Sequence, residues 1–286
     1  PTINDEISQS REPTMSLRVN TNIFSLTAQK NLANHSNQLQ GSFARLSSGL
    51  RIVSAADDAA GLGMSERMRS EIRSLGMAQR NAQEGISLVQ TGEGALSEVA
   101  DMLIRLRELA MESSNETLDL TNRFSIHLEF VALVDEVQRI ADETAYNGIK
   151  LFDGSNPVIP IQIGVDLGDV VNISTWTSTS TLGLGTQNVL TAAAASSALG
   201  AVDVAVDTIS IFRASFGTSH NILSSALRSS ATAQESLAGA ESRIRDADVA
   251  SETAHLAKNR ILQQAATSVL AQANQQPQIA LSLLQG

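Results

Sequence analysis

The sequence predicts a mainly α-helical protein: an elongated antiparallel helical bundle or coiled coil, with a small β-hairpin between two helical arms. The first observation is the placement of proline. Residues 14–156 and 161–276 contain none, and proline breaks helix interiors. The second is that apolar residues recur at heptad spacing in both arms. The third is composition: aromatic residues make up only 3% of the chain, so small apolar side chains must fill the core, which favours packed helices.

Three apolar seams predict three helices in the first arm. The seams are Leu32, Leu39, Phe43, Leu46, Leu50 and Val53; then Val89, Leu96, Val99, Leu103, Leu106 and Ala110; then Ile126, Phe130, Leu133, Val137 and Ile140. Ser47-Ser48-Gly49 interrupts the first helix, and the acidic pair Asp57-Asp58 suits the N-terminus of the second. Polar residues 115–121 separate the second helix from the third. Asn147-Gly148 is expected to cap the end of the third helix, because both residues tolerate the left-handed conformation.

The centre of the chain has a different period. Apolar residues alternate at period 2 on both sides of the turn residues 166–169, which predicts a β-hairpin. The alternating residues are Ile159, Ile161, Ile163 and Val165, and then Val171, Ile173 and Thr175. Residues 177–188 are rich in Ser, Thr and Gly and are expected to form a loop. The second helical arm is expected to begin at Thr191-Ala192.

The terminal helices are expected to lack an internal partner long enough to cover their apolar seams. Exposed apolar area costs roughly 25 cal/mol per Å², so contacts between copies are the expected way to bury it. Head-to-tail contacts that do not close produce an open helical filament. The seams therefore predict self-assembly.

Signals for catalysis are weak. The chain has no cysteine, which excludes disulfides, thiolate metal sites and thiol nucleophiles. Its four histidines, His35, His127, His220 and His255, show no metal-ligand spacing, and no glycine-rich phosphate loop occurs. We therefore expect no enzyme activity, no catalytic residues, no cofactor and no metal.

Charge and hydropathy exclude two further classes. The net charge of -10 argues against a nucleic-acid partner. No stretch reaches roughly 18 consecutive apolar residues, so no membrane span is expected. Residues 1–14 are polar and lack the apolar region of a Sec signal peptide, and we interpret them as an appended extension.

Specific sequence words carry a resemblance. They are Val19-Asn20-Thr21-Asn22, Arg45-Leu46-Ser47-Ser48-Gly49-Leu50-Arg51-Ile52, Ala56-Asp57-Asp58-Ala59-Ala60-Gly61, Ser242-Arg243-Ile244-Arg245-Asp246-Ala247-Asp248 and Val269-Leu270-Ala271-Gln272-Ala273-Asn274-Gln275. With these words in order at both ends, the chain closely resembles bacterial flagellin from about Met15 to Gly286.

The resemblance implies a structural subunit that polymerises into the flagellar filament for motility. It implies a terminal coiled-coil core domain of residues 15–58 with 243–286, and a helical rod domain of residues 59–242. The rod domain includes the hairpin and loop at about 153–190, and residues 1–14 lie outside the resemblance. Large variable outer domains are expected to be absent, because only about residues 153–196 lie between the arms.

The resemblance also implies partners and a location. The chain would bind copies of itself, a flagellar export chaperone, and the cap and hook-junction proteins. It would lie outside the cell in the bacterial flagellum or at the cell surface, exported through the flagellum's own channel without a Sec signal. An alternative function is a flagellin-like cell-surface adhesin or ligand-binding protein. Trp176 and Tyr146 are the only Trp and Tyr, which disfavours an aromatic platform for sugars.

Two sets of site residues follow from the resemblance. Recognition by Toll-like receptor 5 would use Arg105, Leu109 and Glu129; the first two lie one helical turn apart, and Leu109 lies off the predicted seam, so we expect it to be partly exposed. The alternative is that all three pack subunit against subunit. The polymerisation seam would comprise Leu39, Phe43, Leu46, Leu262, Val269, Leu270 and Leu283.

Overall fold

The computed structural model describes residues 21–175 and 182–285, and only the backbone of residues 278–285. These residues form five α-helices and four β-strands, as predicted for a mainly α-helical chain. The chain divides into two compact units. The terminal unit takes in the residues up to Ser65 together with those from Glu241 onward, and the central unit comprises Glu66–Ala240.

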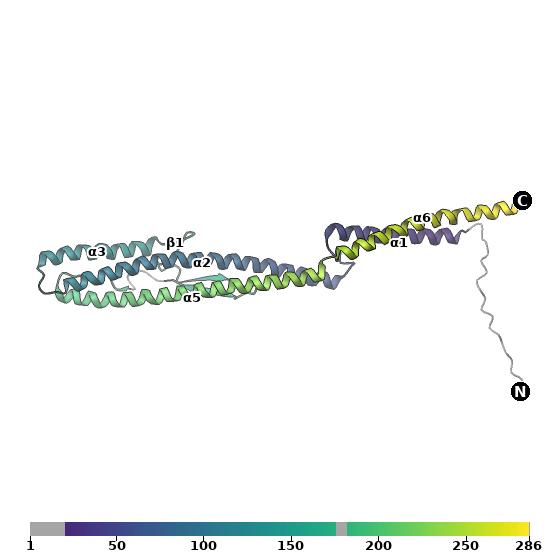
Figure 1. The fold of residues 1–286 in the computed structure, drawn as a ribbon. Coiled ribbons are helices and arrows are strands. Elements are labelled where there is room, and N and C mark those ends of the chain that lie inside the picture. The colour runs from purple at the N-terminus through teal and green to yellow at the C-terminus, as the bar shows by residue number, and fades with distance from the viewer. Residues whose placement is uncertain (1–20, 176–181, 286) are drawn as a thin grey trace, which may run out of the picture. The chain divides into compact units, whose positions relative to one another are not determined.

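The terminal unit is built on an antiparallel pair of helices, α1 (Ile23–Ser48) and α6 (Val249–Gln285) (Figure 1). The Asn22 side chain caps the start of α1, since its Oδ1 accepts a hydrogen bond from the Ser25 amide at 3.1 Å. Gly49, with φ of 72°, ends the helix in the left-handed conformation, which only glycine adopts without cost. The predicted break at Ser47-Ser48-Gly49 is therefore confirmed.

The central unit contains three long helices side by side: α2 (Ala59–Ser113), α3 (Leu120–Glu143) and α5 (Ala192–Arg245) (Figure 1). The part of α2 from Glu66 onward and the part of α5 up to Ala240 belong to this unit. Polar contacts fix α2 antiparallel to both neighbours. Arg105 on α2 pairs with Glu129 on α3. Towards α5, Arg107 pairs with Asp203 at 2.6 Å and Glu93 with Arg213 at 2.9 Å.

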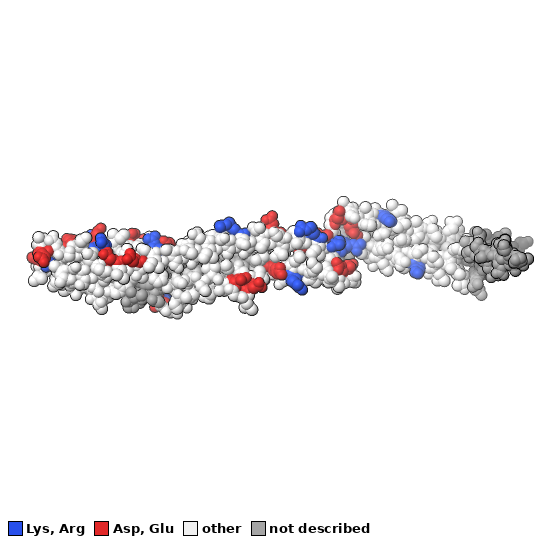
Figure 2. All heavy atoms as spheres, turned by 90° about the horizontal axis from the view of Figure 1, so that it is seen from below, with Lys and Arg blue, Asp and Glu red and all other residues white. Residues whose placement is uncertain are grey.

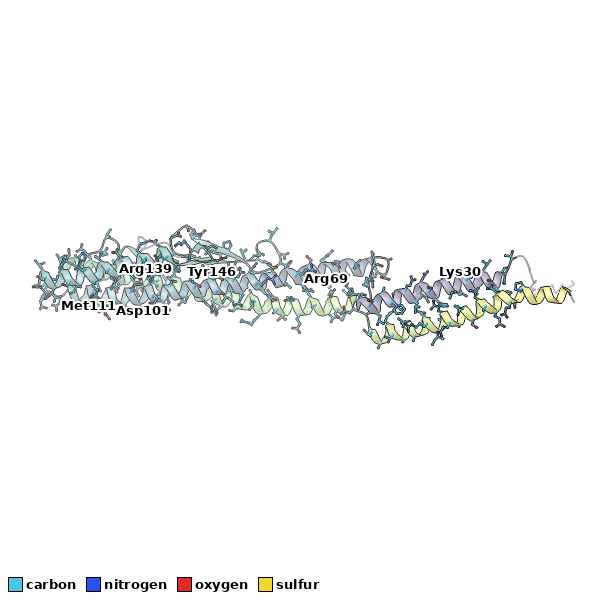
Figure 3. All side chains as sticks on the ribbon, turned by 90° about the horizontal axis from the view of Figure 1, so that it is seen from above. Lys30, Arg69, Asp101, Met111, Arg139 and Tyr146 are labelled. Carbon is cyan, nitrogen blue, oxygen red and sulfur yellow. The ribbon has the colours of Figure 1, made fainter. Side chains whose placement is uncertain are left out.

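Charged side chains are distributed unevenly between the helices. Red and blue side chains are interspersed along the helices of the central unit in Figure 2, where Arg139 on α3 pairs with Glu136 and Glu143. Charged residues are sparse on α1 and α6, where Lys30 is the labelled example in Figure 3.

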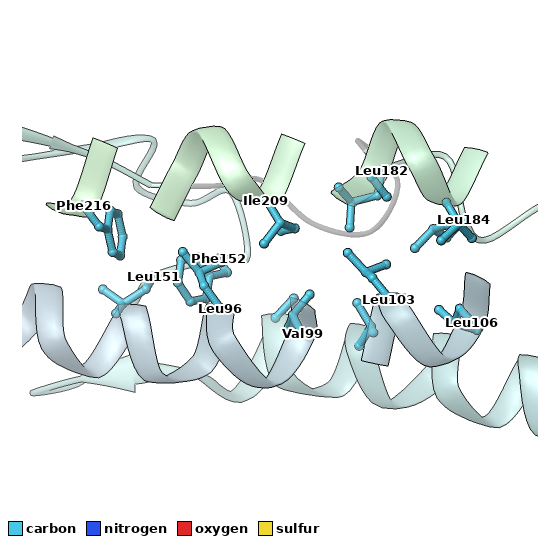
Figure 4. Close-up of a cluster of buried hydrophobic side chains, with 14 of the residues drawn as sticks. Leu96, Val99, Leu103, Leu106, Leu151, Phe152, Leu182, Leu184, Ile209 and Phe216 are labelled. Carbon is cyan, nitrogen blue, oxygen red and sulfur yellow. The ribbon is translucent and has the colours of Figure 1, made fainter. Parts of the chain in front are cut away.

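The core of the central unit follows the predicted seam of α2. Its six members are at most 3% exposed: Val89, Leu96, Val99, Leu103, Leu106 and Ala110. Opposite them, Phe216 of α5 stacks on Phe152 with ring centroids 6.2 Å apart (Figure 4). The Phe216 ring lies directly against Gly92, where a larger side chain would collide with it. The predicted α3 seam is also confirmed, with Phe130 and Val137 fully buried.

One of these helices is long and apolar enough by composition to cross a membrane. It is α5, whose most apolar 18-residue window has a mean hydropathy of 1.4. Its Val202, Ile209 and Phe216 side chains are buried in the core of the central unit. Packing accounts for only part of this hydropathy, because 28% of the window is buried and other apolar residues of α5, such as Val204 and Ile211, remain 63% and 68% exposed.

Two small antiparallel sheets lie between α3 and α5. Strands β3 (Val158–Gln162) and β4 (Val170–Ser174) form the predicted hairpin, with Ile159 opposite Ile173. Strands β1 (Ala145–Tyr146) and β2 (Ile149–Lys150) form a second hairpin. Asn147 and Gly148, with φ of 48° and 81°, are its turn. The expectation that they cap α3 was wrong: the left-handed conformation is present, but α3 ends at Glu143 and the two residues reverse the chain between strands.

Candidate functional site

The α1–α6 pair has a regular facing stripe made largely of small side chains. Ser25, Ala28 and Ser42 of α1 are buried, as is Ala273 of α6. Half-buried leucines extend this stripe, seven residues apart on α1 and six and eight residues apart on α6: Leu32, Leu39 and Leu46, and Leu256, Leu262 and Leu270. Small residues at the closest contacts let the two backbones approach.

Polar contacts hold this pair in one antiparallel register. At one end, Asn22 Nδ2 donates to the Ala273 carbonyl at 2.7 Å and Ser25 Oγ donates to Asn274 Oδ1 at 2.8 Å. At the other end, Arg45 Nη2 lies 3.1 Å from Glu252 Oε1. The hydrogen bond from Arg45 holds the pKa of the Glu252 carboxyl below its ordinary value of 4.5. The terminal helices were expected to lack an internal partner long enough to cover their seams. They do have an internal partner, but each covers only one face of the other, and large apolar side chains such as Phe43 and Val269 stay exposed.

The predicted polymerisation seam divides into two groups. Leu39, Leu46, Leu262 and Leu270 are half-buried between α1 and α6. Phe43 and Val269 instead remain exposed, at 44% and 58%, because Ser42 and Leu270 occupy the facing positions one residue away. Leu283 lies beyond the side chains that the structure describes. Val53, which the sequence placed on the same helical seam as Phe43, follows the end of α1 and is 43% exposed.

Large apolar side chains remain exposed on the outside of the pair. They are between 44% and 65% exposed: Ile23, Phe24, Leu26, Phe43, Val249, Ile261 and Val269. Arg260 lies over the Phe43 ring, 5.3 Å from its centroid. Two helices can bury only their facing stripes, so these side chains form an apolar surface available to other chains.

The connection after α1 explains two of the sequence words. The Arg51 amide donates to the Arg245 carbonyl at 2.6 Å, and the Ala247 amide donates to the Gly49 carbonyl at 2.9 Å. The Arg51 guanidinium also donates to the Ile244 carbonyl, which lies in the last turn of α5. The sequence segment around Ser48-Gly49 and the segment around Asp246 thus pair with each other, within the terminal unit.

The acidic pair Asp57-Asp58 has the capping role that the sequence predicted. Asp58 Oδ1 accepts from the Gly61 amide at 2.8 Å at the start of α2. Asp57 Oδ2 accepts from the amide and hydroxyl of Ser54, and the Ser54 amide is the main cause that lowers the pKa of the Asp57 carboxyl. Both carboxylates are therefore engaged in local structure. Within the described residues, no three His, Asp or Glu side chains converge as metal ligands would.

The predicted receptor-recognition residues lie on the central unit. The structure brings Arg105 of α2 and Glu129 of α3 together on the surface, with Arg105 Nη2 2.8 Å from Glu129 Oε1 and both side chains 48% exposed. Arg105 also donates to Glu108 at 2.9 Å. These two acids, Glu108 first, raise the pKa of the Arg105 guanidinium.

Leu109 does not belong to that surface. Its side chain is only 1% exposed, so the expectation of partial exposure was wrong. The reason is that α2 contacts more than one helix. Leu88 and Leu109 belong to the buried core of the central unit, while Glu93 and Arg107, on the other flank of the α2 seam, contact α5.

Paired terminal helices with an exposed apolar surface, attached to a three-helix unit, define a structural protein built for self-assembly. Family models match most of the chain: the bacterial flagellin N-terminal helical region at residues 19–157 and the bacterial flagellin C-terminal helical region at residues 199–284. The chain belongs to the bacterial flagellin family, whose members form the extracellular flagellar filament.

Individual relatives agree over nearly their full lengths. The flagellin of Halalkalibacterium halodurans is 42% identical over 269 residues, which cover 93% of this chain and 99% of the relative. The flagellar filament 30.7 kDa core protein of Treponema maltophilum is 39% identical over 282 residues, with the same coverage of 93% and 99%. A solved structure assigned to a flagellar hook-associated protein of Vibrio parahaemolyticus superposes with a TM-score of 0.57 at 17% identity, covering 66% of this chain and 100% of that one. That likeness supports the fold alone.

Proposed function

We propose that this chain is the structural subunit of a flagellar filament for motility, and that the exposed apolar side chains of the α1–α6 pair are buried between subunits. The observation that carries the proposal is the set of seven large apolar residues that the pair leaves exposed among the side chains that the structure describes. Fully burying such a side chain is worth about 1.5–3 kcal/mol, so half-exposed ones still offer about 1 kcal/mol each. A subunit would gain roughly 7 kcal/mol before the entropic cost of association.

The predicted seam then has two roles. Leu39, Leu46, Leu262 and Leu270 hold α1 against α6 and shape the assembling surface. Phe43 and Val269 contact neighbouring subunits directly. Leu283 is proposed for the same contact on the basis of the family resemblance.

The proposed domains leave little of the chain outside the terminal core domain and the rod domain. We infer a terminal core domain of residues 15–58 with 243–286, a rod domain of residues 59–242, and no large variable outer domain. The supporting observation is that two short hairpins occupy most of the described chain between α3 and α5. The proposed extension, residues 1–14, lies outside the described residues.

Family membership supports the remaining partners. The chain would be exported through the flagellum's own channel, with the help of an export chaperone. It would also contact the cap and hook-junction proteins. No enzyme activity is proposed, because the described carboxylates discussed above serve as caps and ion pairs.

Toll-like receptor 5 is proposed as a partner of the released monomer. Arg105 and Glu129 would contact the receptor, since both are half exposed and adjacent. The buried Leu109 would contribute indirectly, by positioning α2 against α3. If the same surface also packs between subunits in the filament, the receptor would recognise only released monomers. Receptor ectodomain binding by wild type and Arg105→Ala separates the two, because loss of binding with intact filaments supports recognition.

The function is tested with purified chain under polymerising conditions, viewed by electron microscopy, and with a strain that lacks the gene. We expect filaments from wild type and loss of swimming in the deletion strain. Val269→Asp places a charge in the exposed seam, where burial without a partner is costly, and should block assembly. Ser268→Asp adds the same charge at the next, polar and exposed position and should still form filaments. Monomeric wild type under all conditions, or filaments from Val269→Asp equal to wild type, would contradict the proposal.

A further inference from the structure

Helix α3 carries a second apolar face that its own core does not use. Phe130 and Val137 are buried against the central core, whereas Leu120, Phe124, Leu128 and Val131 are exposed by 75%, 53%, 57% and 39%. These four residues, which we call the α3 stripe, follow at intervals of four, four and three, so they lie along one side of the helix. Leu128 and Phe130 are two residues apart and point in nearly opposite directions. The α3 stripe therefore lies on a different side of α3 from the residues buried in the core.

Helix α5 carries a comparable face. Val204, Ile211 and Ile222, which we call the α5 stripe, are 63%, 68% and 47% exposed. Their spacings of seven and eleven residues return to the same side of a helix. The positions between them on that side, Thr208, Ser215 and Thr218, carry no charge. The Thr208 and Thr218 hydroxyls donate to the Val204 and Ala214 carbonyls of their own helix, so burying them leaves these two donors satisfied.

The two stripes are complementary in extent and in side-chain size. The α3 stripe spans about 16 Å and the α5 stripe about 27 Å at 1.5 Å per residue, so the first fits within the second. Large side chains on α3, Phe124 and Leu128, meet small ones on α5, such as Ser215. Such a surface accepts knobs into holes.

We propose that the α3 stripe of one subunit packs on the α5 stripe of a neighbouring subunit in the polymer. This inference rests on the proposed function, because the polymer supplies the second copy. Contact between two α3 stripes would be self-complementary and would close a dimer, whereas contact between different surfaces propagates without closing. Since the two stripes lie on different helices, each subunit offers both halves of the contact.

The absence of cysteine from the sequence gives a clean crosslinking test. Two single variants, Leu128→Cys and Ile211→Cys, are polymerised separately and as an equal mixture, then treated with a short bismaleimide. The mixture should give crosslinked dimers, and each variant alone should stay monomeric on a denaturing gel. The double variant Leu128→Cys/Ile211→Cys should give a ladder of higher oligomers. Phe124→Cys with Ile222→Cys repeats the test at a second pair of positions.

The outcomes separate this inference from the proposed function. Filaments in which neither Cys pair crosslinks, or in which Leu128→Cys crosslinks with itself, would overturn the α3–α5 contact while leaving the filament function intact. Wild type that forms no filaments would instead overturn the function. In a second measurement, Leu128→Asp should raise the critical concentration for polymerisation by about tenfold, or 1.4 kcal/mol, with wild-type helicity. Ser125→Asp, at an exposed polar position on the same helix, should change it little; equal effects of the two variants would also overturn the contact.

Discussion

A methyl group at Gly92 would test how tightly the central core is packed. A Cβ added at Gly92 would lie 3.2 Å from Cζ and 3.3 Å from Cδ2 of Phe216, and closer still to Cε2. The Phe216 ring is fully buried and stacks on Phe152, so it has little room to move. Gly94, two residues along the same helix, has no such neighbour within 4 Å of the position that a Cβ would take. The two glycines therefore form a matched pair.

The expected changes in the free energy of unfolding differ between the two variants. Replacing a helical glycine by alanine stabilises a helix by about 1 kcal/mol, and Gly94→Ala should show that gain. Gly92→Ala receives the same gain but forces the Phe216 ring to shift, and overpacking a core costs about 1–3 kcal/mol. Gly92→Ala should therefore be less stable than Gly94→Ala by about 1–3 kcal/mol. Relative to wild type it should lie between no change and a loss of about 2 kcal/mol.

Urea unfolding of the monomer, followed by circular dichroism, measures both variants under one set of conditions. The same pair is then compared in a Phe216→Leu background, where the smaller side chain removes the collision. The penalty at position 92 should shrink there, because the two substitutions act on one contact. Equal stability of the two alanine variants in the wild-type background would show that the ring moves freely, and the packing argument would be wrong.

Three further changes test other contacts. Lowering pH should weaken the α1–α6 pair: the folded pKa of Glu252 is lowered by Arg45, so its stabilisation is present above about pH 4.5 and is lost as pH falls through the folded value. Helicity of Glu252→Gln should depend less on pH over that range, and equal acid sensitivity would count against the pair. Leu109→Ala should destabilise the central unit by about 2–5 kcal/mol, measured by urea unfolding, whereas Arg105→Ala should leave the midpoint nearly unchanged because exposed ion pairs contribute little. Asp58→Ala should cost about 1 kcal/mol through loss of the α2 cap, and an unchanged Tm would argue that another group replaces it.

Heptad spacing predicted the central core well because it reports which side of a helix meets a partner. Val89, Leu96 and Leu103 repeat every seven residues, and all three are buried. Strand alternation placed the β3–β4 hairpin for the same reason, since Ile159 and Ile173 face the core as a cross-strand pair. In both cases the period of the pattern matches the geometry of one regular element.

The errors arise where more than one neighbour competes for a residue. Leu109 looks peripheral when α2 is considered against one partner, but it is buried in the core of the central unit. On α1, Phe43 is the larger apolar residue, yet Ser42 faces α6 because close approach of two helices favours small side chains. Asn147-Gly148 carries the same signal for a helix cap and for a hairpin turn. The short strands that decide between these two alternatives have too few residues to show a period.

The sparse charge on α1 and α6 bears on the proposed burial of these helices between subunits. In these two helices only Lys30, Arg45, Glu252, Lys258 and Arg260 are charged. Arg45 and Glu252 neutralise each other, and Arg260 lies over Phe43, so covering the pair removes few isolated charges from water. Burial of a charge without a partner is the largest cost an interface can incur. Most of the acidic side chains that give the chain its net charge of -10 lie instead in the central unit, where mixed ion pairs such as that of Arg107 with Asp203 remain at the surface. The sequence thus places its net charge in the central unit and leaves few charges on the two helices that are proposed to be covered in the filament.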